Sequence, residues 1–353
     1  MLYSSAENDK MQCHNNKSPR DSSTTQKSFY CTQEKPKFTL KHLWEEINTL
    51  ADDKKEDAEL DLLGMERSDT IDETKEFLSR KIDALLEELD SIDEKEAFEL
   101  AMFMNPDYAV SKSFMTKFLR ADRYDIHKTA KRIVKYWDRK VQLFGTEASF
   151  RPLELHDLKH EDMAAILLGG IRRLPDDDLS GRPIIMSYRK FWDNRPSHME
   201  SNLRLLWYVV HDSVEEELAQ TSGLVWLMKN DMPMGSVSMI PVEHLLDVRD
   251  ALPIRCAGIH WFLPNYWVQY MFEHMLAFTS PEIRARVRIY TGNDSKTHME
   301  ELEEYGIPRE SLPAEFGGTL VFNYLEWITF LLEDDSGTYS GVQDMDEESS
   351  DED

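Results

Sequence analysis

Residues 257–272 read AGIHWFLPNYWVQYMF, a run without a single charged side chain. Its first six residues have the apolar and aromatic character of a buried strand. Pro264 follows, and proline suits the first turn of a helix. The polar stripe of that helix would consist of only Asn265, Gln269 and Glu273. A helix that is apolar almost all round is buried in a core or faces lipid, so the stretch predicts a strand followed by a helix in one of these two environments.

Three other short runs share the strand-like character of 257–262, at 183–188, 223–228 and 287–290. Between the first two of these in chain order, residues 201–218 place apolar side chains at helical spacing along one face. Strands that alternate with helices favour a largely parallel sheet joined by crossover connections. The sequence therefore predicts an α/β fold with helices flanking a mixed, largely parallel sheet.

Helical patterns precede the α/β segment. Apolar residues recur near helical spacing at 77–89 in a charged background, and again at 114–141 with a turn at 122–125. This period is typical of amphipathic helices, and Gly145 would end the second pattern. We expect a small all-helical subdomain ahead of the sheet.

The net charge of −26 is concentrated in the flanks of the chain. Residues 38–100 carry 21 acidic and eight basic residues, and 333–353 carry ten acidic residues and no basic one. The first 37 residues are rich in Ser, Thr, Asn and Lys, a composition typical of disorder. We predict four segments: a disordered segment at 1–37, acidic helices and the helical subdomain at 38–150, the α/β domain at 151–330, and a disordered acidic tail at 331–353.

One basic region stands out in this acidic chain. Residues 112–140 contain ten Lys and Arg residues against three Asp. This excess could attract an anionic lipid headgroup or a membrane surface. Alternatively, it is a solvated helix face balanced by the acidic region 38–100, and the sequence leaves both readings open. Nucleic acid is not expected as a partner, because no recognition motif occurs and the acidic flanks would oppose phosphate.

The three cysteines at 13, 31 and 256 have neither disulfide nor zinc spacing, which favours a reducing compartment. The N-terminus is polar from Ser4 onward and does not resemble a secretory signal. No window has the ~20 apolar residues that span a bilayer. We therefore expect a cytoplasmic, monomeric protein that associates with membranes only peripherally.

The sequence offers little for catalysis. His211, Asp212 and Ser213 have the residue types of a hydrolytic triad, but consecutive helical residues point about 100° apart and cannot form one. His156 and His160 have zinc-ligand spacing without an obvious third ligand. No glycine-rich nucleotide motif occurs. The sequence therefore predicts no enzyme activity, no cofactor and no metal site.

Large, adaptable apolar side chains are abundant between residues 184 and 280. They could form an aromatic-rich core, or the conformable wall of a cavity for a long apolar ligand. Composition alone leaves both readings open. The residues that we single out as a candidate cavity wall are Tyr188, Trp207, Trp226, Met228, Trp261, Phe262, Tyr266, Trp267, Tyr270, Met271 and Phe278.

Four motifs appear in a familiar order. They are FLRADRYD at 118–125, DLSGRPI at 178–184, LPIR at 252–255 and LPAEFGG at 312–318. In this order they resemble the CRAL-TRIO (Sec14-like) lipid-binding family, as a divergent member. The resemblance implies a helical N-terminal subdomain and an α/β lobe with a deep lipid pocket. It also implies that the apolar helix at about 264–278 is a movable gate over that pocket.

The resemblance also suggests headgroup residues. Arg123 matches a basic position of the first motif, and Glu243 matches a glutamate that precedes the third. The lysine that phosphoinositide-binding members carry in the gate has no counterpart around 274–277. Phosphatidylinositol is therefore not favoured over another hydrophobic lipid.

The sequence supports two main hypotheses. In the first, the chain is a non-enzymatic protein that binds a hydrophobic lipid, transfers it between membranes and docks transiently on a membrane surface. In the second, the same fold has a collapsed, ligand-free pocket and serves as a protein-interaction or regulatory module. A hydrolase would require a nucleophile activated by residues distant in sequence.

Overall fold

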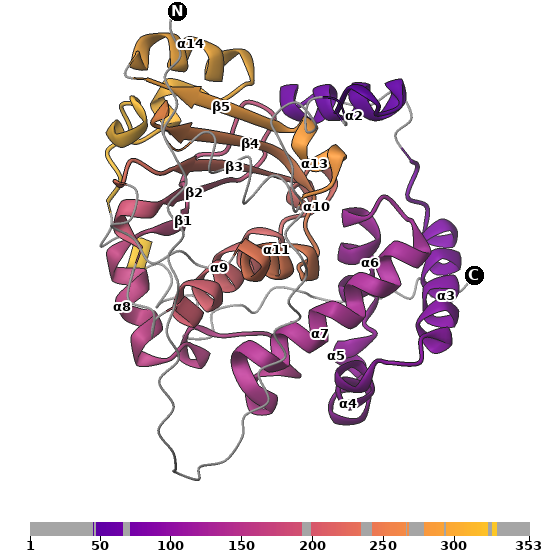
Figure 1. Ribbon diagram of the computed structural model, residues 1–353. Coiled ribbons are helices and arrows are strands. Elements are labelled where there is room, and N and C mark those ends of the chain that lie inside the picture. The colour runs from indigo at the N-terminus through magenta and orange to yellow at the C-terminus, as the bar shows by residue number, and fades with distance from the viewer. Residues whose placement is uncertain are drawn as a thin grey trace, which may run out of the picture. The chain divides into compact units, whose positions relative to one another are not determined.

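A five-stranded sheet lies at the centre of the computed structural model (Figure 1). Its strands follow the order β1-β2-β3-β4-β5; β1 pairs antiparallel with β2, and the other pairs are parallel. The mixed, largely parallel sheet expected from the sequence is therefore confirmed. The strands are β1 Ile171–Arg173, β2 Ile184–Tyr188, β3 Leu224–Lys229, β4 Cys256–Leu263 and β5 Val287–Thr291.

The structure describes only part of the chain, all of it within the unit Lys37–Asp353. The predictions of disorder at 1–37 and 331–353 therefore fall outside the described residues. The described residues are 45, 47–65, 71–192, 199–233, 242–265, 267, 279–292, 294–323 and 327–329.

Helices surround the sheet and form the region before it. The N-terminal helices are α2 Asp52–Leu63, α3 Lys75–Ser91, α4 Glu96–Met104, α5 Pro106–Ala109, α6 Lys112–Ala121 and α7 Ile126–Ser149. The later ones are α8 His160–Leu168, α9 Met199–Ser213, α10 Glu217–Ser222, α11 Val242–Ala251, α13 Pro281–Ala285 and α14 Ser295–Glu304. Short 3-10 turns are η1 Leu155–Asp157, η2 Arg189–Phe191, η5 Arg309–Ser311 and η6 Ala314–Phe316.

Two of these elements differ from the expectation. The apolar pattern at 201–218 predicted one helix, but α9 ends at Ser213 and α10 begins at Glu217. Leu218, assigned to the apolar face of a single helix, is 46% exposed on α10. Strand β1 was not anticipated, because its three residues are one isoleucine and two arginines, too few for an alternating pattern.

The N-terminal helical subdomain has an aromatic core. Phe114 and Phe118 of α6 pack against Tyr136 and Trp137 of α7, with the centroids of contacting rings 5.2–5.5 Å apart. Tyr136 also packs against Trp207 of α9 at 5.1 Å. Such aromatic pairs stabilise a fold by more than the burial of their apolar area alone. They join the helical subdomain to one of the helices that cover the sheet.

The sheet has a separate apolar core on each face. On the first face, residues of α7, α9 and α11 pack against Ile185 and Trp226 of the sheet. On the second face, Met299 and Leu302 of α14 pack against Met186 and Leu227. Figure 1 shows α14 on one side of the sheet, with α9 and α11 on the other. The cavity described below lies on the first face.

The second face contains a buried histidine in β4. The Nδ1 atom of His260 lies 2.8 Å from the hydroxyl oxygen of Tyr290 in β5. Burial, together with the charges of Arg288 and Arg182, lowers the pKa of His260 to about 3. The imidazole is therefore neutral in the folded chain, whereas the unfolded chain protonates it near pH 6.5.

We expect His260→Gln to make stability less sensitive to acid. The contribution of neutral His260 is fully present above pH 6.5 and is lost as the pH falls from 6.5 toward 3. Between pH 6.5 and 5 the wild type should lose about 1.5 kcal/mol more than the variant, measured by urea unfolding. His156→Gln removes a histidine whose side chain is 60% exposed and is the matched control. Equal pH dependence in wild type and His260→Gln would contradict the assignment.

Candidate functional site

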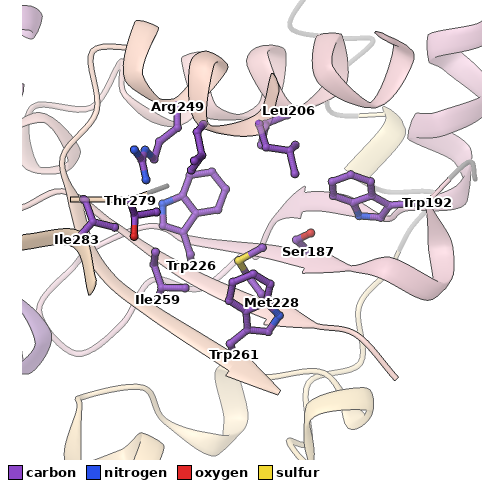
Figure 2. A pocket seen from close by; sticks show the side chains of 12 residues that line it. Ser187, Trp192, Leu206, Trp226, Met228, Arg249, Ile259, Trp261, Thr279 and Ile283 are labelled. Carbon is purple, nitrogen blue, oxygen red and sulfur yellow. The ribbon is translucent and has the colours of Figure 1, made fainter. Parts of the chain in front are cut away.

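An apolar cavity lies between the first face of the sheet and the helices that cover it (Figure 2). The sheet side carries indole, thioether and aliphatic side chains, and the helix side carries leucines and one arginine. The lining residues are Ser187, Trp192, Leu206, Trp226, Met228, Leu245, Leu246, Arg249, Ile259, Trp261, Thr279 and Ile283.

Strand register explains the sheet side of the cavity. Ser187 of β2 pairs with Met228 of β3, which pairs with Trp261 of β4. Two residues earlier on β3 and β4, Trp226 pairs with Ile259. Because side chains alternate along a strand, residues two apart share a face and paired residues do too. These two rows therefore bring side chains from three strands to one surface.

The helix side comes from α9 and α11, and the segment around α13 closes one end. Figure 2 shows Leu206 of α9 and Arg249 of α11 reaching the cavity from the helices above the sheet. Thr279 and Ile283 lie at the start of the α13 segment. The space between the described walls has a volume of about 100 Å³. An apolar cavity of about 150 Å³ accommodates benzene, so this volume suits part of one acyl chain and a whole lipid needs a wider space.

Few polar groups border the cavity. The indole nitrogen of Trp192 donates to the carbonyl of Gly170 at 3.0 Å, so it is already satisfied. The guanidinium of Arg249 donates through Nε to the carboxylate of Asp250 at 2.8 Å. An apolar surface with a few polar groups at its edge is typical of sites that bind hydrophobic ligands.

The predicted wall residues divide between the two faces of the sheet. Trp226, Met228 and Trp261 line the cavity. Tyr188 and Phe262 belong to the second face, where Tyr188, Lys229, Phe262 and Tyr290 form one cross-strand row. Tyr188 directly follows the cavity residue Ser187, and Phe262 directly follows Trp261. A shift of one residue along a strand reverses the face.

Trp207 is fully buried, and its ring packs against Tyr136 and Phe144 of α7. It is not one of the cavity residues. Leu203, Leu206 and Trp207 lie at helical spacing within the predicted helix 201–218, and all three are buried. Which buried neighbour it meets depends on the packing of α7 against α9, which no local pattern encodes.

The predicted gate at 264–278 is described only at its start. Trp267 is 4% exposed, and its Nε1 donates to the carbonyl of Met232 at 2.6 Å. Its backbone N–H donates to the carbonyl of Pro264 at 2.9 Å, which is consistent with a helical turn beginning at the proline. The other predicted gate residues, Tyr266, Tyr270, Met271 and Phe278, lie outside the described residues.

The two headgroup candidates are differently placed. Arg123 follows α6, and its guanidinium donates to Asp57 at 2.5 Å and to Asp61 at 3.2 Å, both on α2. Glu243 lies near the start of α11, and its side chain falls outside the described residues. The structure therefore places Arg123 against α2 and not in the cavity lining.

The basic region 112–140 is extensively paired within the chain. Arg120 donates to Glu73 at 3.0 Å, and Arg132 donates to Asp122 at 2.7 Å. Lys135 lies 3.0 Å from the carboxylate of Asp247 on α11. These pairs favour the reading in which acidic residues of the chain balance this region. Exposed lysines such as Lys112 and Lys131 remain available to an anionic surface.

His211 and Ser213 bond to other partners and do not form a hydrolytic triad. The Ser213 hydroxyl donates to the carbonyl of Val209 at 2.7 Å, and His211 Nε2 lies 3.2 Å from the Tyr136 hydroxyl. Burial raises the pKa of the Cys256 thiol to about 11, so little thiolate exists at neutral pH. No group of three His, Cys, Asp or Glu residues in the described part of the chain could hold a metal.

Several cavity residues were missed by the sequence analysis. Ile259 and Ser187 are neither aromatic nor methionine, so composition did not single them out. Ile259 lies on the same face of β4 as Trp261, and Ser187 pairs with Met228 of β3. The two-residue period from Trp261 to Ile259 was a usable signal. Leu245 and Arg249 lie four apart on α11, and nothing in their local sequence indicates that α11 covers the cavity.

Comparison with known proteins identifies one domain. Residues 169–318 match the family model described as the CRAL/TRIO domain. The crystal structure of Sfh5 aligns with a TM-score of 0.39 and 8% identity, covering 75% of this chain and 98% of Sfh5. No curated protein matches the chain. In the described residues, none of the helices combines the length and apolar character needed to cross a membrane.

Proposed function

We propose that this chain, whose residues 169–318 form a CRAL/TRIO domain, binds a hydrophobic lipid and carries it between membranes without catalysing a reaction. The observation that supports the proposal is the apolar cavity walled by Trp192, Trp226, Trp261 and Met228. Each buried methylene of an acyl chain would contribute about 0.8 kcal/mol. Affinity can then arise from apolar burial without a specific hydrogen bond.

Exchange of a lipid requires the cavity to open. The segment 264–278 remains our proposed gate, because it is apolar and directly follows β4, which carries Trp261 and Ile259 into the cavity. The buried indole of Trp267 and its bond to Met232 would hold the start of this segment closed. An apolar gate can face either the cavity or the apolar interior of a bilayer.

Membrane contact would be transient in this proposal. Exposed lysines on α6 and α7, including Lys112 and Lys131, supply attraction to anionic lipid. The acidic flanks at 38–100 and 333–353 oppose it and make docking sensitive to salt. We propose a monomer in the cytoplasm, with the four segments bounded at 37, 150 and 330.

The size of the cavity favours one alternative. About 100 Å³ is too small for a whole lipid, so the same domain could instead be a ligand-free interaction module. In that case the indoles of Trp226 and Trp261 would act as core side chains. A partner would then recognise another surface, such as the acidic flanks.

The two functions predict different masses for the purified protein. Under the lipid-binding proposal, native mass spectrometry should show a bound species that organic extraction removes and identifies as a lipid. Removing it should lower the melting temperature, because a ligand stabilises the state that binds it. A protein that carries no lipid, and whose melting temperature does not change after lipid is added, would support the interaction module.

A further inference from the structure

A cluster of arginines lies at the edge of the sheet where its parallel strands begin. Arg182, Arg255 and Arg286 lie at the entry to β2, β4 and β5, respectively. Arg123 joins them from the turn between α6 and α7, and Arg288 follows on β5. Because the amino ends of parallel strands share one edge, residues far apart in sequence meet there. We call these five residues the arginine cluster.

Helix α2 covers the arginine cluster with its own carboxylates. Asp61 accepts from Arg286 Nη2 at 2.6 Å, from Arg123 at 3.2 Å and also from Arg255. Asp57 accepts from Arg123 at 2.5 Å. The Asp61 side chain is only 3% exposed, so these ion pairs are shielded from water.

The rest of α2 adds to the same contact. Glu59 lies 3.1 Å from the guanidinium of Arg288. The carbonyl of Leu62, in the last turn of α2, accepts from Arg182 at 3.3 Å. A helix C-terminus carries partial negative charge, so it also attracts a cation. Figure 1 shows α2 beside α13 and the ends of β4 and β5.

Apolar contacts also hold α2 at this edge of the sheet. Of its apolar side chains, Ala58 and Leu62 are buried, and Leu62 lies against Gly258 of β4. A 12-residue helix is marginally stable alone. The ion pairs with the arginine cluster therefore contribute, together with these apolar contacts, to holding α2 in place.

Helix α2 does not supply a carboxylate to every arginine of the cluster. Arg182 is already paired with Asp178 at 2.6 Å. The remaining four arginines meet three α2 carboxylates, those of Asp57, Glu59 and Asp61. Burial, together with the neighbouring charge of Arg286, lowers the pKa of Arg255 to about 10.

We propose that the arginine cluster is an anion-binding site for a ligand bearing two or more phosphate groups, and that α2 occupies this site in the ligand's absence. Guanidinium groups bind phosphate through paired N–H donors, and convergent arginines match several phosphates at once. The same chemistry occurs in a phosphorylated lipid headgroup and in a soluble inositol polyphosphate. Displacement of α2 would expose the site and couple the anion to the position of the acidic N-terminal helix.

The test compares four full-length variants. Asp57→Asn with Asp61→Asn weakens the hold of α2 while preserving side-chain size. Asp53→Asn with Glu56→Gln makes the same charge change at two exposed positions of α2 and is the matched control. Leu62→Ala loosens α2 without altering charge. Adding Arg255→Gln and Arg286→Gln to the first variant removes the site itself.

Two probes separate the sources of phosphate. Inositol hexakisphosphate tests the soluble source by calorimetry, and phosphatidylcholine vesicles with 5% phosphatidylinositol bisphosphate test the lipid source by sedimentation. We expect Asp57→Asn/Asp61→Asn and Leu62→Ala to bind at least one probe about tenfold more tightly than wild type. The matched control should change less than twofold, and the arginine substitutions should abolish the gain.

Circular dichroism establishes that each variant is folded before binding is measured. If the double Asn variant does not fold, Leu62→Ala decides the question. Tighter binding of inositol hexakisphosphate would show that the site recognises phosphate groups in a soluble ligand. Tighter binding only to vesicles would show that it recognises the lipid headgroup. Folded variants that bind neither probe more tightly than wild type, or that bind as tightly without Arg255 and Arg286, would overturn the proposal.

Discussion

Replacing Met228 by Trp is expected to reduce the lipid that co-purifies with the chain at least tenfold. Met228 lies on β3 between Ser187 and Trp261 in the row that forms the cavity floor. An indole at this position would fill much of a space of about 100 Å³. Overpacking costs about 1–3 kcal/mol in a filled core and should cost less beside an existing cavity, so the fold should survive.

Met228→Leu is the matched control for this experiment, because it conserves volume and apolar character. Lipid extraction and mass spectrometry of both variants measure occupancy relative to wild type. We expect Met228→Leu to retain lipid and Met228→Trp to lose it while its unfolding transition stays cooperative. Equal occupancy in Met228→Trp would place the ligand outside this cavity.

The second large effect concerns the helix pair that supports the cavity. Asp162 of α8 is fully buried and binds Arg204 of α9 through two hydrogen bonds of 2.7 and 2.9 Å. Arg204 is itself only 4% exposed. Removing the carboxylate leaves the buried Arg204 guanidinium with only the exposed carboxylate of Glu200, at 3.4 Å, so Asp162→Ala should destabilise the fold by about 3–5 kcal/mol. Urea unfolding at neutral pH measures the loss.

Glu161→Ala changes an exposed carboxylate on the same helix and should alter stability by no more than about 0.5 kcal/mol. Replacing both members of the pair, as Asp162→Leu with Arg204→Met, should recover much of the lost stability, because no unpaired charge remains. A loss below about 1 kcal/mol in Asp162→Ala would show that water reaches Arg204. Since Leu206 of α9 lines the cavity, the destabilised variant should also retain less lipid.

Local patterns predicted most of the elements. The four strand-like runs became β2 to β5, and the apolar positions at 77–89 became α3, with Leu85 and Leu89 fully or almost fully buried. Strand β1 escaped detection because three residues carry no period. The division of the 201–218 pattern into α9 and α10 was also not predicted. Leu218 fits the helical spacing of the pattern although its side chain is exposed, and spacing alone does not distinguish exposed from buried leucines.

The sequence indicated the chemical type of the cavity wall better than it indicated which residues form it. Trp226, Met228 and Trp261, which we predicted as wall residues, line the cavity, and their contact with a lipid stays a prediction. Tyr188 and Phe262 have the same chemical character but face the other core, with ring contacts to Phe191 and Tyr290. Side-chain type is a property of the sequence, whereas the face it occupies is set by strand register.

The sequence by itself determined that this chain has alternating strands and helices and a large supply of aromatic and methionine side chains. Periodicity and composition are local, so they are visible without coordinates. Only the tertiary structure decided which of these side chains share a cavity, because a shift of one residue exchanges the two faces of a strand. It also joined Asp61 to Arg286, 225 residues away. Ion pairs over such distances depend on the packing of α2 against the sheet edge, and no local pattern specifies that packing.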